Sequence, residues 1–234
     1  DPTGEMTKTY LNVILSFAEK DPEVLVRIAA IQGMTDLLLI FKDKFLGQED
    51  VQEGDDLTKE TIEKAIRVML AYASEDTAAT VSNDSNESDN PELDELVDGI
   101  RQQRIICVDA LTRLTFLRRC SDIKVLKELI LLAYRADTED YPEIRQCLVV
   151  FLPLFAKSGK INRMMVEQAT MEVMEDIMYP ADAGKYGKTK PDVVGKFLLF
   201  LAGGDMPPRG ETSTSIHGRI GIQMILRILA EPNI

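Results

Sequence analysis

The sequence has little of what disulfide-bonded, metal-binding or membrane-spanning proteins need. It contains three cysteines, one histidine and no tryptophan among 234 residues. Cys107, Cys120 and Cys147 are odd in number and have neither CxxC spacing nor a nearby histidine, so they predict reduced core thiols and no metal site. No run reaches the roughly 18 uninterrupted apolar residues that cross a bilayer, so we expect no membrane association. The opening residues do not resemble a signal peptide, which predicts the cytoplasm or nucleus.

Residue combinations that carry catalysis are also missing. His217 has no acidic residue within the next dozen positions to orient it as a general base. The glycine pair at 203–204 does not follow a strand-like run, so it predicts no phosphate-binding loop. Asp55 and Asp56 lack the spacing of a calcium loop. We therefore predict that the chain is not an enzyme and takes no cofactor or small-molecule substrate.

The composition favours helix. Hydrophobic residues make up 45% of the chain, which is ordinary for a globular core, and Leu, Ile, Met, Ala, Glu and Lys are prominent. The formal net charge is −12 at pH 7. A charge of this sign opposes indiscriminate attraction to nucleic acid, so any binding of DNA must be local.

Apolar periodicity predicts a series of helices. Apolar residues recur at three- and four-residue steps from Tyr10 to Phe17, and this pattern stops at Lys20. Asp21 is a good N-cap, and Pro22 fits the first position of a second helix. Further helices are expected at about 58–73, 92–119, 122–135, 142–157, 161–178, 191–202 and 216–230. No strand is compelling, so the fold class is all-α.

Two stretches differ from the helical pattern. Residues 76–91 are rich in Ser, Asp and Asn and predict a disordered acidic insertion, because too few apolar residues offset the entropy of ordering. Residues 180–190 are rich in Gly and Lys and predict a flexible loop. We expect a single domain over 1–234 and, because the chain begins without Met, a piece of a longer polypeptide.

A spacing typical of HEAT repeats occurs twice. In the runs DPEVLVRIAA at 21–30 and EDYPEIRQ at 139–146, an acidic residue precedes an arginine by six positions: Asp21 with Arg27, and Glu139 with Arg145. Short paired helices with this signature predict an α-α superhelix, a solenoid in which an acidic–arginine ladder fixes the stacking of repeats. The alternative is a helix cap beside a surface arginine.

Longer segments resemble a known family. The run KELILLAY at 127–134, the turn TED at 138–140 and the helix IRQCLVVFLPLFA at 144–156 are similar in order and spacing to the C-terminal HEAT region of the CAP-G subunit (subunit 3) of condensin. The run VRIAAIQGMTDLL at 26–38 and residues 217–228 with Pro232 extend the resemblance. The run at 134–137 and Leu152 depart from the family pattern, which leaves a condensin II paralogue or a cohesin-type subunit open.

The resemblance implies a function that the composition does not indicate. A CAP-G-like chain would be a non-catalytic scaffold of condensin in mitotic chromosome condensation. It would bind the kleisin subunit, help to clamp double-stranded DNA without sequence specificity, and meet other condensin subunits indirectly. It would act in the nucleus and on chromosomes, with a cytoplasmic pool. The alternative is a HEAT adaptor of cohesin, transport or signalling that binds peptides and no DNA.

Basic residues gather between 101 and 127, after a stretch with none. On a helix at 100° per residue, Arg101, Arg104 and Arg119 fall within about 60° of one another and are expected to face solvent together. With Arg118 and Lys124 they form the predicted DNA-phosphate contact, given what the resemblance implies. A solvated helix face is the alternative.

The kleisin contact is expected on the helix at 142–157. Solenoids bind extended peptides along surfaces built from the second helix of each pair. Ile144, Leu148 and Phe151 belong to the core side of this helix, which leaves Val149 and Val150 as candidates. Packing against the next repeat is the alternative explanation.

Overall fold

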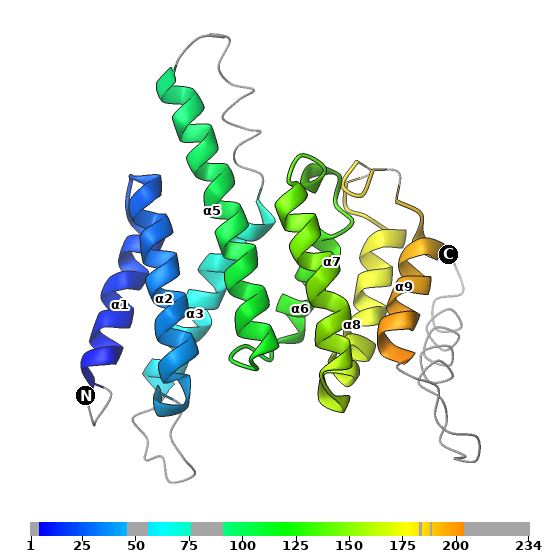
Figure 1. Ribbon diagram of the computed structural model, residues 1–234, viewed down its shortest axis with the longest axis horizontal. Helices are drawn as coiled ribbons and strands as arrows, with labels where there is room; N and C mark the ends of the chain where they lie inside the picture. Colours follow the sequence, from blue (N-terminus) through cyan, green and yellow to red (C-terminus); the bar gives the residue numbers. More distant parts are fainter. Residues whose placement is uncertain (1–4, 46–55, 76–90, 183, 188, 204–234) are drawn as a thin grey trace. The chain divides into compact units, whose positions relative to one another are not determined.

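The computed structural model describes residues 5–45, 56–75, 91–182, 184–187 and 189–203, and within these ranges it contains helices and no strand (Figure 1). The helices are α1 (Glu5–Lys20), α2 (Val24–Phe45), α3 (Asp56–Ser74), α5 (Pro91–Phe116), α6 (Ile123–Leu132), α7 (Pro142–Lys157), α8 (Lys160–Met178) and α9 (Pro191–Gly203), with a 3-10 turn at Ala136–Thr138. The predicted all-α fold is confirmed. The helix expected at 216–230, His217 and residues 76–90 of the expected insertion lie outside the described residues.

The chain divides into two compact units, Asp1–Ser121 (unit 1) and Asp122–Ile234 (unit 2). Unit 1 consists of two antiparallel helix pairs, α1 with α2 and α3 with α5 (Figure 1). Helices α1 and α3 form one layer, and α2 and α5 form the other. The pairs close a core of Leu11, Leu15, Ala18, Ile28, Ile31, Met34, Leu38, Ile62, Met69, Cys107, Leu111 and Leu114.

The turn between α1 and α2 shows how the first pair is closed. The Asp21 carboxylate accepts a hydrogen bond from the Glu23 amide at 2.9 Å. Helix α2 begins at Val24, so Pro22 precedes the helix and does not occupy its first position as predicted. The carboxylate of Asp21 stabilises the turn by satisfying an amide that helix geometry leaves without an intrahelical partner.

Unit 2 repeats the same plan with α6 and α7 as one antiparallel pair and α8 and α9 as the next. Helices α6 and α8 share one layer, and α7 and α9 share the other. The pairs close a core of Leu126, Leu129, Ile130, Ile144, Leu148, Leu152, Phe155, Val166, Val173, Val194 and Leu198. Helix α6 starts at an N-cap, because the Asp122 carboxylate accepts from the Lys124 amide at 2.8 Å.

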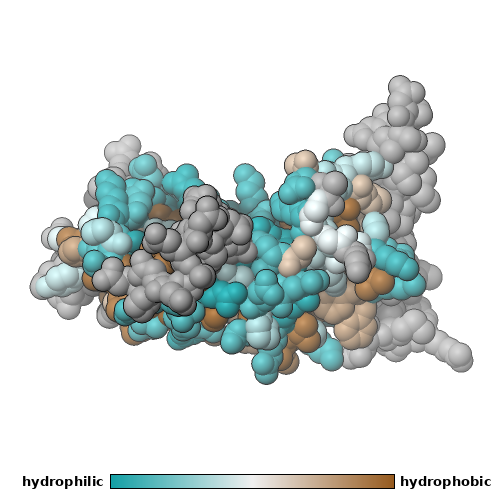
Figure 2. All heavy atoms as spheres, turned by 90° about the horizontal axis from the view of Figure 1, so that it is seen from above, coloured by the Kyte–Doolittle hydropathy of each residue, from teal (hydrophilic) through white to brown (hydrophobic). Residues whose placement is uncertain are grey.

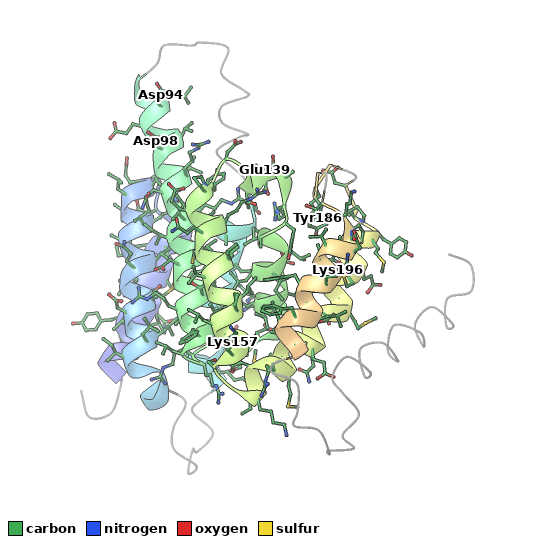
Figure 3. All side chains as sticks on the ribbon, turned by 45° about the vertical axis from the view of Figure 1, so that its right-hand side comes forward. Asp94, Asp98, Glu139, Lys157, Tyr186 and Lys196 are labelled. Carbon is green, nitrogen blue, oxygen red and sulfur yellow. The ribbon has the colours of Figure 1, made fainter. Side chains whose placement is uncertain are left out.

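The described part of the loop at 180–190 is docked on unit 2. Tyr186, labelled in Figure 3, is only 4% exposed, and the Ala136 amide donates to the Lys185 carbonyl at 2.9 Å. Gly187 has a φ of 54°, and a Cβ at this position would lie 3.3 Å from the Cβ of Ala136. Glycine is therefore required for the close approach to the 3-10 turn. The flexibility expected for this loop stays a prediction.

The cysteines are free, and two of the three match the predicted core thiols. Cys107 and Cys120 are buried, whereas Cys147 on α7 is partly exposed. Burial raises the pKa of the Cys107 thiol because the thiolate would lose its hydration. Within the described residues, no helix is long and apolar enough to span a membrane.

Candidate protein-binding surface

The structure separates the arginines that were predicted to form one solvent-facing patch. Arg101 is exposed, but Arg104 is only 2% exposed, and its Nε donates to the Ala73 carbonyl at 3.0 Å. Helix α5 packs on both α2 and α3, so its buried face is wider than the single apolar stripe assumed from the sequence. The prediction that Arg104 faces solvent and contacts DNA phosphate is therefore wrong.

Helix α5 was expected to carry Arg119 but ends before it. Outside this helix therefore lie Arg118, Arg119 and Lys124. Helix α5 ends at Phe116, Arg118 takes a φ of 55°, and the Arg119 amide donates to the Leu114 carbonyl at 2.7 Å. The position predicted for Arg119, on the same side of the helix as Arg101 and Arg104, therefore does not apply, because Arg119 lies in this turn. From Arg101 to the end of α5 the helix rises about 22 Å. Lys124 is exposed in the first turn of α6, which belongs to unit 2.

The two arginines of the repeat signature have different surroundings. Arg27 Nη1 donates to the carbonyl of Asp21 at 2.8 Å, and its Nε donates to Oε1 of Gln103 at 3.3 Å. Its guanidinium carbon also lies 6.0 Å from the ring centroid of Tyr72. Since Gln103 and Tyr72 belong to the second helix pair, Arg27 links the two pairs of unit 1. The link runs through a side-chain amide and a ring and not through a carboxylate.

Arg145 makes its contacts inside its own helix pair. Its Nη2 donates to the Arg135 carbonyl at 3.2 Å and lies 3.6 Å from Oε1 of Glu139, and its Nε donates to Oγ1 of Thr138 at 3.4 Å. All of these partners lie in the connection between α6 and α7. Arg145 and Glu139 thus stabilise a local turn and do not link successive pairs.

The outward side of α2 and α5 in unit 1 is acidic and ion-paired. Arg113 lies 4.0 Å from Asp36 across the two helices and 3.6 Å from Asp109 on its own helix. These side chains line a shallow groove together with Gln32, Thr35, Ile106 and Ala110. Toward the start of α5, the exposed Asp94 and Asp98 add negative charge (Figure 3). This surface, the α2/α5 face, opposes the approach of DNA phosphate.

The outward side of α7 and α9 in unit 2 carries several exposed apolar residues among polar ones. Val149, Val150 and Leu154 on α7 are 65%, 54% and 53% exposed, although Leu148, Phe151, Leu152 and Phe155 on the opposite side are buried. On α9, Val193 is 52% and Phe200 61% exposed. We call these five exposed residues the α7/α9 face. Figure 2 shows hydrophobic residues at the surface of unit 2 among hydrophilic ones.

Contiguous exposed apolar surface is a feature of sites that bind other proteins. Lys157 on α7 and Lys196 on α9, both exposed, provide polar groups on the same two helices (Figure 3). The prediction singled out Val149 and Val150, and both are exposed, so packing against α9 does not bury them. It did not name Leu154, Val193 and Phe200, which are exposed as well. A comparison of both helices of the layer would have found them, because Val193 and Phe200 recur seven positions apart on α9.

Together, antiparallel helix pairs stacked in two layers define the chain as a helical-repeat protein. Within the described residues, no group of three or more His, Cys, Asp or Glu is placed to hold a metal ion. The chain belongs to the family of nuclear condensing complex subunits, C-terminal domain, whose family model matches residues 3–233.

Two relatives support the same assignment. The chain is 23% identical over 244 aligned residues to condensin complex subunit 3 of Xenopus laevis and 22% identical over 238 residues to condensin complex subunit 3 of Homo sapiens. Each alignment covers 97% of this chain but only 23% and 22% of the relative. The chain therefore spans about a quarter of the length of these relatives.

Proposed function

We propose that this chain is a non-catalytic part of a condensin subunit and that its α7/α9 face binds the kleisin subunit. The exposure of Val149, Val150, Leu154, Val193 and Phe200 on the second helices of two successive pairs is the observation that carries the proposal. Fully burying one such side chain contributes about 1.5–3 kcal/mol, so a few of them can hold an extended peptide once ordering costs are met.

A double substitution on α7 tests this contact. Val150→Asp with Leu154→Asp places two charges in the face and should weaken binding to the kleisin by about 10-fold or more, because each carboxylate would be desolvated on binding. Leu25→Asp on α2 is the matched control, since Leu25 is 68% exposed and belongs to unit 1. Isothermal titration of the chain with the kleisin, with helicity checked by circular dichroism, measures both. Equal affinities of the two variants would contradict the proposal.

The second part of the proposal concerns double-stranded DNA. Arg101, Arg118, Arg119 and Lys124 would contact phosphates without reading bases, as the family relationship to condensin favours. Arg101 and Arg118 are exposed. Phosphate contacts of this kind supply affinity and steering but little sequence information. The site of action would be the nucleus and its chromosomes.

Charge reversal separates DNA contact from a solvated surface. Arg101→Glu, Arg118→Glu and Arg119→Glu together should lower the affinity of the chain with its kleisin for DNA and flatten the plot of log affinity against log salt by about 2.7. Arg67→Glu, at an exposed position of α3, is the matched control. Several unrelated duplexes at two or more salt concentrations should give the same result. Wild-type affinity and slope in the triple variant, with kleisin binding intact, would instead favour a peptide-binding adaptor without DNA.

A further inference from the structure

Helix α7 contains a proline in its interior. The helix spans Pro142–Lys157, so Pro153 lies well beyond the first turn, the part of a helix in which proline is tolerated. Pro153 has no N–H to donate to the carbonyl of Val149, which residue 153 would otherwise bond within the helix. Its ring also crowds that carbonyl, which opens the helix locally. The Val149 carbonyl is therefore an acceptor that has lost its usual intrahelical donor.

This carbonyl lies on the α7/α9 face. Val149 and Val150 are 65% and 54% exposed, and Pro153 is half-buried. At 100° per residue, Pro153 lies about 40° around the helix from Val149 and about 60° from Val150, between the two. Since the carbonyl of Val149 points along the helix axis toward Pro153, it lies among these apolar side chains. Leu154, which is 53% exposed, borders the same point of the face.

Covering the α7/α9 face changes the surroundings of this carbonyl. In the uncovered chain, water can donate to it, as it does to other carbonyls on the solvent side of a helix. A bound protein segment would displace that water, and a buried carbonyl without a donor costs free energy comparable to a lost hydrogen bond. A partner that covers Val149 and Val150 favourably must therefore supply a donor at this point.

We infer that the Val149 carbonyl is a specificity-determining acceptor of the α7/α9 face, and that the kleisin meets it with a backbone amide of an extended segment. The amides in the middle of a helix are bonded internally, whereas those of an extended segment are free to donate. An amphipathic helix would cover the apolar residues and leave the carbonyl without a donor, so the carbonyl selects against it. This inference rests on the proposed kleisin contact and adds the kind of segment that it accepts.

Restoring the N–H at position 153 tests the acceptor. Pro153→Val keeps a similar apolar volume and supplies the missing donor within the helix, so it should weaken binding of the kleisin by about 3- to 10-fold. Because proline is the least favourable residue in a helix interior, this variant should unfold at a higher temperature than the wild type, which separates the loss of affinity from unfolding.

Pro142→Val is the matched control for this substitution. Pro142 is exposed at the start of the same helix, where its missing N–H has no intrahelical acceptor. The substitution therefore leaves the carbonyls of α7 as they are, and Pro142→Val should bind the kleisin as the wild type does. Isothermal titration with the kleisin measures the affinities, and circular dichroism follows the thermal midpoints.

Synthetic segments of the kleisin identify the donor. Short overlapping peptides first locate the segment whose binding is weakened by Val150→Asp with Leu154→Asp. In that peptide, each backbone amide is then replaced by an ester, one at a time. One ester should weaken binding to the wild-type chain by about 3- to 10-fold and have little effect on binding to Pro153→Val, because the same hydrogen bond is lost only once.

The outcomes separate this inference from the proposed contact. Wild-type affinity in Pro153→Val, with weaker binding in the double variant of Val150 and Leu154, would overturn the inference and keep the kleisin contact. A loss of affinity in Pro153→Val that no ester reproduces would overturn it as well, because the donor would then not be a backbone amide. Wild-type affinity in both variants would overturn the contact and the inference together.

Discussion

Units 1 and 2 follow one plan and present different surfaces. Each has two antiparallel helix pairs in two layers, and each buries aliphatic residues between them. The α2/α5 face of unit 1 carries Asp36, Asp109 and Arg113 in ion pairs, whereas the α7/α9 face of unit 2 exposes apolar residues such as Val149 and Phe200. The inner sides of the helices are constrained by packing, but the outer sides are not, so the outer sides can differ and carry binding.

The same contrast holds for the arginines of the repeat signature. Arg27 links two helix pairs through Gln103 and lies over Tyr72, whereas the partners of Arg145 all lie in the preceding turn. A shared spacing in sequence therefore does not guarantee a shared role. The neighbours that decide the role come from a helix distant in the chain: Gln103 is 76 residues from Arg27.

The largest effect is expected for a buried arginine of unit 1. Arg104→Ala should lower the free energy of unfolding by about 3 kcal/mol, because it removes the hydrogen bond to the Ala73 carbonyl and leaves a cavity. Arg101→Ala, at an exposed position of the same helix, should change it by less than about 0.5 kcal/mol. Urea denaturation measures both, and hydrogen exchange should localise the loss to unit 1. Equal effects of the two substitutions would show that Arg104 is not buried as described.

A smaller difference should separate the two signature arginines. Arg27→Ala is expected to cost about 2 kcal/mol, since the guanidinium bonds two carbonyls and Gln103 and contacts a ring. Arg145→Ala should cost about 1 kcal/mol or less, because its side chain is 37% exposed and its ion pair with Glu139 is solvated. Chemical denaturation of each variant checks the order. A larger loss of unfolding free energy for Arg145→Ala than for Arg27→Ala would contradict the different roles assigned to the two arginines.

The last effect appears only at alkaline pH and belongs to unit 2. Burial raises the pKa of Tyr134 and of Tyr186 from 10.0 to about 12, and Asp176 and Glu128 add to the shift of Tyr186. Because these pKa values are higher in the folded state, their contribution to stability is full below pH 10 and is lost as the pH rises toward 12. Tyr186→Phe should therefore lose less stability between pH 9 and pH 11.5 than the wild type.

Thermal unfolding across that pH range, followed by circular dichroism, tests the tyrosines. Tyr10→Phe is the control for the chemistry of the substitution, since Tyr10 is 54% exposed on α1 of unit 1. It should follow the wild type at every pH. If Tyr186→Phe does the same, the phenol of Tyr186 titrates in solvent and the loop at 180–190 is not docked at high pH.

Local patterns in the sequence predicted the helices well. The predicted helices within the described ranges end within three residues of the observed bounds, and the largest differences are at Phe116 and Leu132. Both helices end early at turns closed by bonds to backbone carbonyls, such as Arg119 to Leu114, which side-chain periodicity does not reveal. The predicted arginine patch was correct only in part, because a helical wheel treats one helix at a time. Helix α5 packs against two other helices, and this wider contact buries Arg104.

By itself, the sequence determined the all-α class, the paired helices and most of the core sides, because apolar periodicity and turn residues are local properties of the chain. It also determined the family through its motifs. Only the tertiary structure decided that Arg104 is buried, that Arg27 meets Gln103, and that Val149 and Val150 stay exposed. Each of these depends on which helices pack side by side, and burial of a side chain is set by neighbours that lie tens of residues away in the sequence.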